Sequence, residues 1–313
     1  MLDAPVLTSD IASEAIAGLA PTRKTLPPKL FYDAAGVRLF EQITMLPEYY
    51  LTRAETALLR RIAPELAALA RRGSALVEYG ASDEAKASLL LRARGGNFSA
   101  YVPVDVAESA LADIEARLRR AMPRLAVHPL CADFTRAPKL PAAIRTLPKL
   151  GFFPGSTIGN LDPAEARAFL RHAREALGQG AWLIVGADPC QDSEKLVAAY
   201  DDAAGVTAAF NLNVLHRLNR EADADFDADK FEHVAIWNAP ESRMEMHLRS
   251  TVNQRVRIAG MEFRFAAGET IHTENSYKHT VAAFRALATS AGWQPRHVWT
   301  DPDNLFSVHA LVA

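Results

Sequence analysis

Short apolar runs alternate with amphipathic, alanine-rich segments from about Leu58 to Asp188, and this alternation constrains the fold more than any other feature of the chain. The apolar runs have the length of buried strands, and the segments between them have the length of helices. Such an order is typical of a parallel sheet covered by helices on both faces. We predict strands at Ala75–Tyr79, Tyr101–Val104, Leu125–Cys131, Leu150–Phe153 and Ala181–Val185, and helices at Asp83–Ala93, Glu108–Met122 and Pro163–Leu177.

The order of elements changes after about Lys195. Period-two segments there indicate antiparallel strands, and the last elements predict that the chain returns to the first sheet and ends it with an antiparallel hairpin. The first fifty residues, with Pro27 and Pro28, fit neither pattern and are expected to belong with this inserted part. The predicted elements are one helix up to Arg220, strands at Arg243–Arg249 and Gln254–Ile258, a helix at Lys278–Ala291, and strands at Trp293–Thr300 and Leu305–Val312.

Charge and composition exclude several classes of protein. The 313 residues are 49% hydrophobic and carry a formal net charge of −2, so no basic surface suggests nucleic acid as a partner and nothing suggests a membrane. No apolar stretch approaches the roughly 20 residues needed to cross a bilayer, and the first residues do not resemble a signal peptide. We expect a cytoplasmic protein. Cys131 and Cys190 lack metal-type spacing, the nine histidines are scattered, and no metal site is expected.

Acidic residues follow several of the predicted strands, where ligands bind in sheets of this kind. Gly80 follows the first strand, and Asp105, Asp133 and Asp188 follow later ones. A glycine turn followed by an acid at the next strand end can hold the ribose of a dinucleotide or of S-adenosylmethionine. A dinucleotide is disfavoured because the chain lacks the G-x-G-x-x-G pattern. Asp105 could instead be a helix cap, and we prefer to interpret Asp188 as a simple strand-end acid.

Several longer sequence segments, spread from about residue 22 to the end of the chain, carry more information than these single residues. They include Leu26–Asp33, Phe40–Thr44, Leu46–Tyr50, Thr52–Glu55, Gly155–Leu161, Ala199–Asn211, Ala224–Asp227, Phe231–Val234, Thr273–Ser276 and Trp299–Pro302. Together they resemble the histidine-specific N-α-methyltransferases, which form hercynine from L-histidine in the first step of ergothioneine biosynthesis. The resemblance implies an α/β fold, with a Rossmann-like methyltransferase sheet and a smaller α+β substrate domain. It implies a cofactor-binding domain at 55–195 and 278–313, and a substrate domain at 1–54 and 196–277.

The resemblance also implies the residues of two sites. One set holds S-adenosylmethionine, and the other holds histidine between the domains, with Tyr32 and Asn160 in catalytic roles. Asn160 and Tyr200 would bind the substrate carboxylate, Glu274 would accept the imidazole N–H, Ser276 would serve the other ring nitrogen, and Met246 would form an apolar wall. The implied cofactor residues are Tyr32, Gly80, Lys86, Asp105, Asp133 and Phe134; the implied histidine residues are Tyr49, Gly155, Asn160, Tyr200, Met246, Glu274 and Ser276.

One loop departs from the family pattern. The family has a second glycine and a Ser/Thr-rich helix start after the first strand, whereas this chain has Ala81 and Asp83 before Lys86. Losing one hydrogen bond to a charged group costs about 1.5–3 kcal/mol, so weakened cofactor binding is expected.

Other interpretations of these residues stay open. Tyr49 and Tyr50 could be core aromatics, Tyr200 an ordinary helix position, and Glu274 and Ser276 polar residues flanking a loop. An enzyme that methylates another amino acid such as tryptophan, a non-catalytic histidine-binding protein, and, more weakly, an NAD-dependent oxidoreductase are the alternative functions. We expect a monomer.

Overall fold

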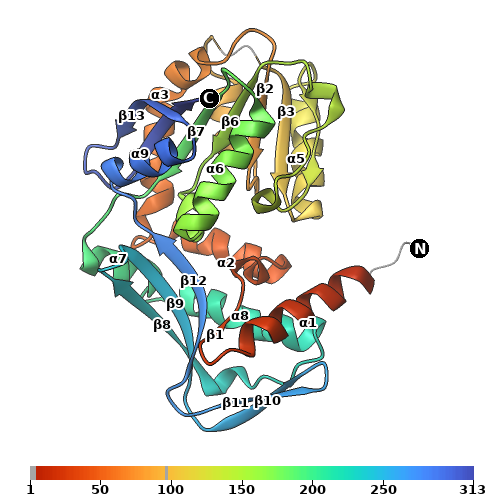
Figure 1. Cartoon of the computed structure of the whole chain (residues 1–313), viewed down its shortest axis with the longest axis vertical. Coiled ribbons are helices and arrows are strands. Elements are labelled where there is room, and N and C mark those ends of the chain that lie inside the picture. Colours follow the sequence, from red (N-terminus) through yellow and green to blue (C-terminus); the bar gives the residue numbers. More distant parts are fainter. Residues whose placement is uncertain (1–4, 96–97) are drawn as a thin grey trace. The chain divides into compact units, whose positions relative to one another are not determined.

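The computed structural model describes residues 5–95 and 98–313, and the chain divides into two compact units (Figure 1). One unit comprises the residues up to Tyr50 together with Gln191–Ser276. The other comprises Leu51–Cys190 and Tyr277–Ala313. The first is called the inserted unit here and the second the sheet unit.

The sheet unit contains an eight-stranded sheet in the order β13-β14-β7-β6-β2-β3-β4, with β5 also paired to β3. The strands from β2 to β7 are parallel, and β14 and β13 complete one edge as the antiparallel hairpin predicted from the sequence. The strands are β2 (Ser74–Tyr79), β3 (Phe98–Asp105), β4 (Ala126–Val127), β5 (Leu130–Cys131), β6 (Lys149–Phe153), β7 (Trp182–Ala187), β13 (Gln294–Thr300) and β14 (Ser307–Val312).

Helices cover both faces of this sheet, as the alternation of elements predicts. Because successive strand residues face opposite sides, Val77 packs with α6 and α9, whereas Leu76 packs with α3, α4 and α5. Gly151 on β6 has no side chain where the last turn of α6 approaches, since an added Cβ would lie 2.6 Å from Leu177 Cδ1. The helices are α3 (Tyr50–Ala68), α4 (Ala85–Leu91), α5 (Glu108–Ala121), α6 (Pro163–Leu177) and α9 (Val281–Ser290), with short 3₁₀ turns η2 (Phe134–Arg136), η3 (Ala142–Ile144) and η4 (Thr157–Asn160).

The inserted unit has a four-stranded sheet in the order β1-β12-β9-β8 and a separate hairpin, β10-β11. Helices α7 and α8 contact β8 and β9, and α2 contacts α8. Phe31 and Phe210 stack within this core, with ring centroids 4.7 Å apart. The elements are α1 (Pro5–Leu19), β1 (Lys24–Thr25), η1 (Pro28–Phe31), α2 (Ala34–Met45), α7 (Ser193–Tyr200), α8 (Val206–Glu221), η5 (Ala228–Lys230), β8 (Phe231–Asn238), β9 (Arg243–Ser250), β10 (Gln254–Ile258), β11 (Met261–Phe265) and β12 (Thr270–Tyr277).

The single helix predicted from Lys195 to Arg220 is wrong. The chain leaves helix α7 after Tyr200, and α8 starts at Val206. Gly205 adopts a left-handed conformation with φ +72°, and the Asp202 carboxylate accepts hydrogen bonds from the backbone N–H groups of Val206 and Thr207 at 2.9 and 2.7 Å. Local capping of α8 therefore outweighs the continuous helical pattern.

The single strand predicted at Leu125–Cys131 is also wrong. It is two short strands, β4 and β5, on either side of His128 and Pro129. Proline has no N–H to donate to a neighbouring strand, so it interrupts the ladder with β3.

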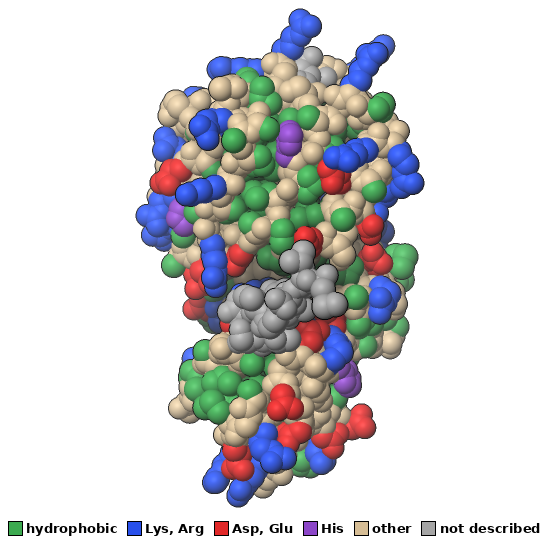
Figure 2. All heavy atoms as spheres, turned by 90° about the vertical axis from the view of Figure 1, so that its right-hand side faces the viewer, with side chains coloured by type: hydrophobic (Ala, Val, Ile, Leu, Met, Phe, Trp, Pro, Cys, Tyr) green, Lys and Arg blue, Asp and Glu red, His purple; other side chains and the backbone are tan. Residues whose placement is uncertain are grey.

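Charged side chains of both signs share the face of the molecule drawn in Figure 2, with neutral and apolar surface between them. Across residues 5–95 and 98–313, no helix combines the length and the hydropathy that a membrane crossing requires.

A fully buried ion pair lies beside the end of β7. The Lys278 ammonium is 2.8 Å from Asp188 Oδ2, and both side chains have 0% exposure. Asp188 Oδ1 also accepts the backbone N–H of Cys190 at 2.8 Å. Asp188 is therefore more than a strand-end acid, because it compensates a buried cation.

We expect Lys278→Met to lower the free energy of unfolding by about 3–5 kcal/mol, because it leaves a buried carboxylate without its cation. Adding Asp188→Asn should recover part of that loss. Denaturant unfolding measures both variants. Arg249→Met is the matched control, because Arg249 pairs with Glu232 on the surface and such pairs contribute about 1 kcal/mol or less. A loss in Lys278→Met no larger than in the control would contradict the assignment.

Candidate active site

Acidic and aromatic side chains gather where β2, β3 and β5 end. Parallel pairing sets Tyr79 beside Val104 and Asp105 beside Cys131, so the residues that follow these strands lie along one edge of the sheet. This edge is where sheets of this class bind ligands.

The loop after β2 uses its backbone N–H groups within the protein. Those of Gly80 and Ala81 donate to the Val104 carbonyl at 2.8 and 3.1 Å, and that of Ser82 donates to the Gly80 carbonyl. These three backbone N–H groups therefore already have partners within the protein. Gly80 has φ +72°, and an added Cβ would lie 3.6 Å from Phe134 Cε1. The glycine thus permits the left-handed turn, and Phe134 lies at ordinary contact distance from it.

Asp83, which departs from the family pattern in this loop, has a local structural role. Its Oδ1 accepts the backbone N–H of Ala85 at 2.7 Å, where α4 begins. Ala81 is buried at 1% exposure. The two residues therefore shape the loop and the helix start, and their effect on cofactor affinity stays a prediction.

Lys86 is held by Glu55, a residue that sequence reasoning did not assign to the site. The Lys86 ammonium lies 2.5 Å from Glu55 Oε2, and Glu55 Oε1 accepts the backbone N–H of Gly155 at 2.7 Å. Glu55 is 1% exposed. One buried carboxylate thereby fixes a predicted cofactor residue next to a predicted substrate residue. The only sequence signal for Glu55 is its place at the end of the string Thr52–Glu55.

Asp105 and Asp133 each satisfy one oxygen within the protein. Asp105 Oδ1 accepts the backbone N–H of Ala107 at 2.8 Å, and burial raises the pKa of the Asp105 carboxyl despite this bond. Asp133 Oδ1 accepts both the N–H and the hydroxyl of Thr135, at 2.9 and 2.6 Å. Asp133 thus caps the 3₁₀ turn η2, whereas Asp105 bonds the residue before α5 and does not cap that helix.

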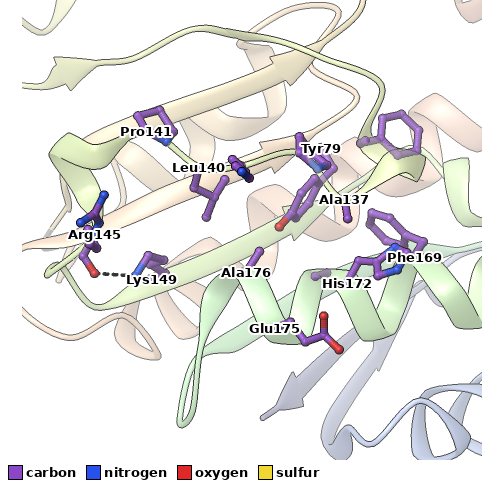
Figure 3. Close-up of a pocket in the computed structure, with 14 residues that line it drawn as sticks. Tyr79, Ala137, Leu140, Pro141, Arg145, Lys149, Phe169, His172, Glu175 and Ala176 are labelled. Carbon is purple, nitrogen blue, oxygen red and sulfur yellow. Dashed lines mark hydrogen bonds between the residues drawn. The ribbon is translucent and has the colours of Figure 1, made fainter.

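A pocket of about 430 Å³ opens on the other side of Phe134, against α6 (Figure 3). The rings of Tyr79 and Phe169 form one wall, and Arg145 and Lys149 lie at the opposite end. Neither Lys86 nor the two edge acids line it. The pocket shares only Phe134 with the predicted cofactor residues, so it does not define the cofactor site.

Glu78 is a buried carboxyl of the same edge. It is 2% exposed and accepts a hydrogen bond from the Tyr101 hydroxyl. Burial raises its pKa to about 8, against the lowering effects of the Tyr101 bond and of the Lys86 charge. At neutral pH, Glu78 is therefore mostly protonated in the folded protein.

In the inserted unit, three predicted histidine-binding residues, Tyr49, Tyr200 and Ser276, belong to one hydrogen-bonded and ring-packed group. The Tyr200 hydroxyl, at the end of α7, donates to Ser276 Oγ at 2.7 Å. The ring of Tyr49 packs edge-on against that of Tyr200, with centroids 6.4 Å apart. Met246 is 2% exposed, and its carbonyl accepts the Thr273 hydroxyl at 2.9 Å.

Glu274 and Ser276 lie within strand β12, so the expectation that they flank a loop is wrong. Buried residues occur at Ile271 and Thr273 and then at Glu274 and Ser276, so the alternation shifts by one residue between Thr273 and Glu274. The Thr273 hydroxyl donates to Asn211 on α8, and Ser276 pairs with α7, so both belong to the face of the sheet covered by these helices. The shift accordingly carries Glu274 to that buried face.

An aromatic group extends from this face toward α2. Phe40 packs edge-on against Tyr32 at 5.9 Å and against Tyr49 at 6.3 Å. Tyr32 also packs against Phe210 of α8. In the sequence, Phe40 is part of the segment Phe40–Thr44 and has no predicted role. Because it lies between two predicted site tyrosines, it is a further candidate residue of the site.

Gly155 and Asn160 belong to the sheet unit, unlike the other predicted histidine residues. Asn160 ends the turn η4 and is half-buried. An added Cβ at Gly159 would lie 2.6 Å from the Tyr277 carbonyl oxygen, so a glycine is needed before Asn160. Within the sheet unit, the structure brings Lys86 near Gly155, and Gly80 near Phe134.

The family model, the relatives and a solved structure to which this chain is similar all belong to methyltransferases or to ergothioneine biosynthesis. A family model described as histidine-specific methyltransferase, SAM-dependent, matches residues 11–313. The histidine N-alpha-methyltransferase of Mycolicibacterium smegmatis is 43% identical, over 98% of this chain and 97% of that protein. Ergothioneine biosynthesis protein 1 of Neurospora crassa is 31% identical, over 92% of this chain and 33% of that protein. A solved S-adenosylmethionine-dependent methyltransferase from Clostridium acetobutylicum shares the fold, with a TM-score of 0.50 at 10% identity, over 88% of this chain and 98% of that chain.

Replacement of Glu78 by glutamine should flatten the pH dependence of stability. A carboxyl whose pKa is raised in the folded state stabilises it fully below the unfolded pKa, near 4.5, and loses this contribution as pH rises toward about 8. The native protein should therefore lose up to about 1.4 kcal/mol per pH unit from this group in that window. Urea unfolding at several pH values tests this. Glu115→Gln, on the exposed side of α5, should keep the native slope, and a native slope in Glu78→Gln would contradict the expectation.

Proposed function

The chain belongs to the family of SAM-dependent, histidine-specific methyltransferases, and we propose that it trimethylates the α-amino group of L-histidine to give hercynine. The observation that carries this substrate is the buried Tyr200–Ser276 hydroxyl pair next to Glu274 on β12. Buried polar side chains that converge on one face are suited to a polar ring such as imidazole. The 43% identity to histidine N-alpha-methyltransferases supports the same substrate.

The edge of the sheet unit fits S-adenosylmethionine in its donor set. Asp105 and Asp133 offer carboxylates to the ribose and to the base, Phe134 offers an apolar ring, and Lys86 offers a cation to the carboxylate of the cofactor. Gly80 supplies the left-handed turn beside Phe134. We assign Tyr32 of the inserted unit to the same ligand on the family resemblance alone. The bound cofactor supplies a methyl group on a sulfonium, which is a good leaving group.

Glu274 and Ser276 would recognise the imidazole ring from its two nitrogens. Glu274 accepts the ring N–H, and Ser276 serves the other nitrogen. The hydrogen bond from the Tyr200 hydroxyl to Ser276 Oγ ties these two side chains together. This arrangement refines the role of Tyr200 expected from the sequence, which was binding of the substrate carboxylate. Asn160 keeps that role in the proposal, and Met246 forms the apolar wall.

The chemical step requires a neutral amine placed in line with the methyl group. Positioning supplies most of the rate enhancement, with the reacting atoms about 3–3.5 Å apart. An α-amino group has a pKa near 8, so the rate should rise through the neutral to mildly alkaline range. Tyr32 or a water molecule could accept the released proton. The faces of Tyr32 and Tyr49 suit the growing alkylated ammonium through cation–π contact. The monomeric state and the cytoplasmic location stay predictions.

Incubation of the purified chain with S-adenosylmethionine and a mixture of amino acids, followed by mass spectrometry, tests the function directly. We expect trimethylated histidine as the sole methylated amino acid. Methylated tryptophan or another methylated amino acid would support methyl transfer but would contradict the proposed recognition of imidazole by Glu274 and Ser276. If no product forms and calorimetry detects no cofactor binding, the methyltransferase proposal fails and the alternative of a non-catalytic histidine-binding protein leads.

Glu274→Ala should raise the histidine KM and reduce discrimination against tryptophan. A site that hydrogen-bonds a ring rejects analogues that leave its polar groups unpaired, by up to about 10⁴-fold. Steady-state kinetics with both amino acids measure the change. Glu262→Ala, on exposed β11, is the control and should leave both constants unchanged. Native kinetics in Glu274→Ala would remove this account of specificity.

A further inference from the structure

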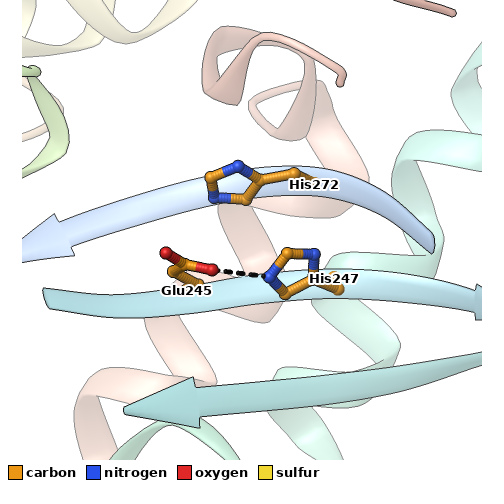
Figure 4. A group of neighbouring side chains, drawn as sticks. All are labelled: Glu245, His247 and His272. Carbon is orange, nitrogen blue, oxygen red and sulfur yellow. Dashed lines mark hydrogen bonds and ion pairs between the residues drawn. The ribbon is translucent and has the colours of Figure 1, made fainter. Parts of the chain in front are cut away.

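Three potential metal ligands meet on the sheet of the inserted unit (Figure 4). Glu245 and His247 lie two residues apart on β9, and His272 lies on the neighbouring strand β12. One ligand atom from each lies within 4.8 Å of those of the other two. The two imidazole rings stack, with centroids 4.6 Å apart and planes inclined by 21°.

This group lies on the face of the sheet opposite to the proposed histidine residues. His233 contacts α7 and α8 through hydrogen bonds to the Tyr200 carbonyl and to Asn211, and it pairs across strands with Leu248. Met246 shares that face with Leu248 because side chains two apart face the same way, whereas Glu245 and His247 face away. The two groups of side chains are therefore separate sites on one sheet.

The carboxylate of the group is oriented before any ligand binds. Asn238 Nδ2 and Arg243 Nε donate to Glu245 Oε1 at 2.8 and 2.7 Å, while Glu245 Oε2 lies 3.0 Å from His247 Nε2. Burial would raise the pKa of Glu245, but the hydrogen bonds from Asn238, Arg243 and His247 outweigh it and hold this pKa at about 2. One oxygen is thus fixed by neighbouring donors, and the other points to the imidazole. Such outer contacts are typical of metal-binding carboxylates.

The imidazoles have lone pairs to offer. A neutral imidazole carries its proton on one nitrogen and a lone pair on the other. His247 Nδ1 is buried and has no hydrogen-bonding partner within the described residues. His272 Nε2 contacts the Glu274 carbonyl at 3.1 Å.

We propose that Glu245, His247 and His272 bind a divalent transition-metal ion of the Zn²⁺ type. Two imidazoles and one carboxylate are the donors that such ions prefer, and three protein ligands leave a coordination position for water. Arg243 neutralises part of the charge of Glu245, so binding should be reversible and the ion removable by a chelator. The sequence expectation of no metal site missed this group because its third ligand comes from another strand, and spacing along the chain does not reveal it.

Calorimetric titration of the metal-free chain with Zn²⁺ tests the proposal, with Co²⁺ absorption as the spectroscopic readout. The protein should carry no histidine tag, and the buffer no free histidine, because both chelate the ion. Cys131→Ser serves as the background, since Cys131 is an exposed thiol. We expect one ion per chain in that background, and imidazole-type Co²⁺ bands.

His247→Gln and His272→Gln should each weaken binding about tenfold or more, and Asn238→Leu about tenfold by releasing the carboxylate. His216→Gln, an exposed position on α8, should bind as the background does. Zn²⁺ should also raise the Tm of the background and not that of the two histidine variants, which separates loss of the site from loss of folding. Absence of binding to the background, or native affinity in both histidine variants, would overturn the proposal.

Discussion

A carboxylate removed from water must be compensated, and the sheet unit meets this requirement in different ways. Glu55 has the Lys86 ammonium and the Gly155 amide, Asp188 has Lys278, and Glu78 keeps its proton. Desolvation makes each unpaired charge expensive, so each compensation fixes a neighbouring segment in place. The loop that carries Lys86, the turn that carries Gly155 and the end of β7 are all positioned by these contacts. The candidate cofactor edge depends on this placement.

The inserted unit depends on a different constraint, namely which side chains of strand β12 face the helices. β12 shifts its alternation of buried residues between Thr273 and Glu274, and Ser276 then pairs with Tyr200 on the helix-covered face. Without the shift, Glu274 would share the face of His272. A single strand therefore supplies polar side chains to both faces, toward the proposed imidazole site on one and toward the proposed metal site on the other.

The sequence predicts the sheet unit well because parallel strands buried on both faces have an unmistakable pattern of short apolar runs. Sequence-based errors lie where local chemistry competes with pattern: Pro129 divides a strand of the sheet unit, and in the inserted unit the capped start of α8 at Gly205 interrupts a predicted helix. The proposed site residues came from long family strings, since spacing alone left Glu274 as a loop residue. Glu55 and His272 could not be found by spacing, because their partners are distant along the chain. A buried contact between remote residues leaves no local periodicity.

The pair of Asp188 and Lys278 also bears on how this protein is divided. The chain passes into the inserted segment after Cys190 and returns at Tyr277, and the two charged residues stand just before the departure and just after the return. The ion pair thus holds the two ends of the inserted segment close together on the sheet unit. A segment whose two ends lie close together on a domain can be inserted or exchanged like a surface loop. Residues 191–276 could consequently be exchanged as one segment, whereas Tyr49, Gly155 and Asn160 of the proposed histidine site lie outside it and would have to match the new amine.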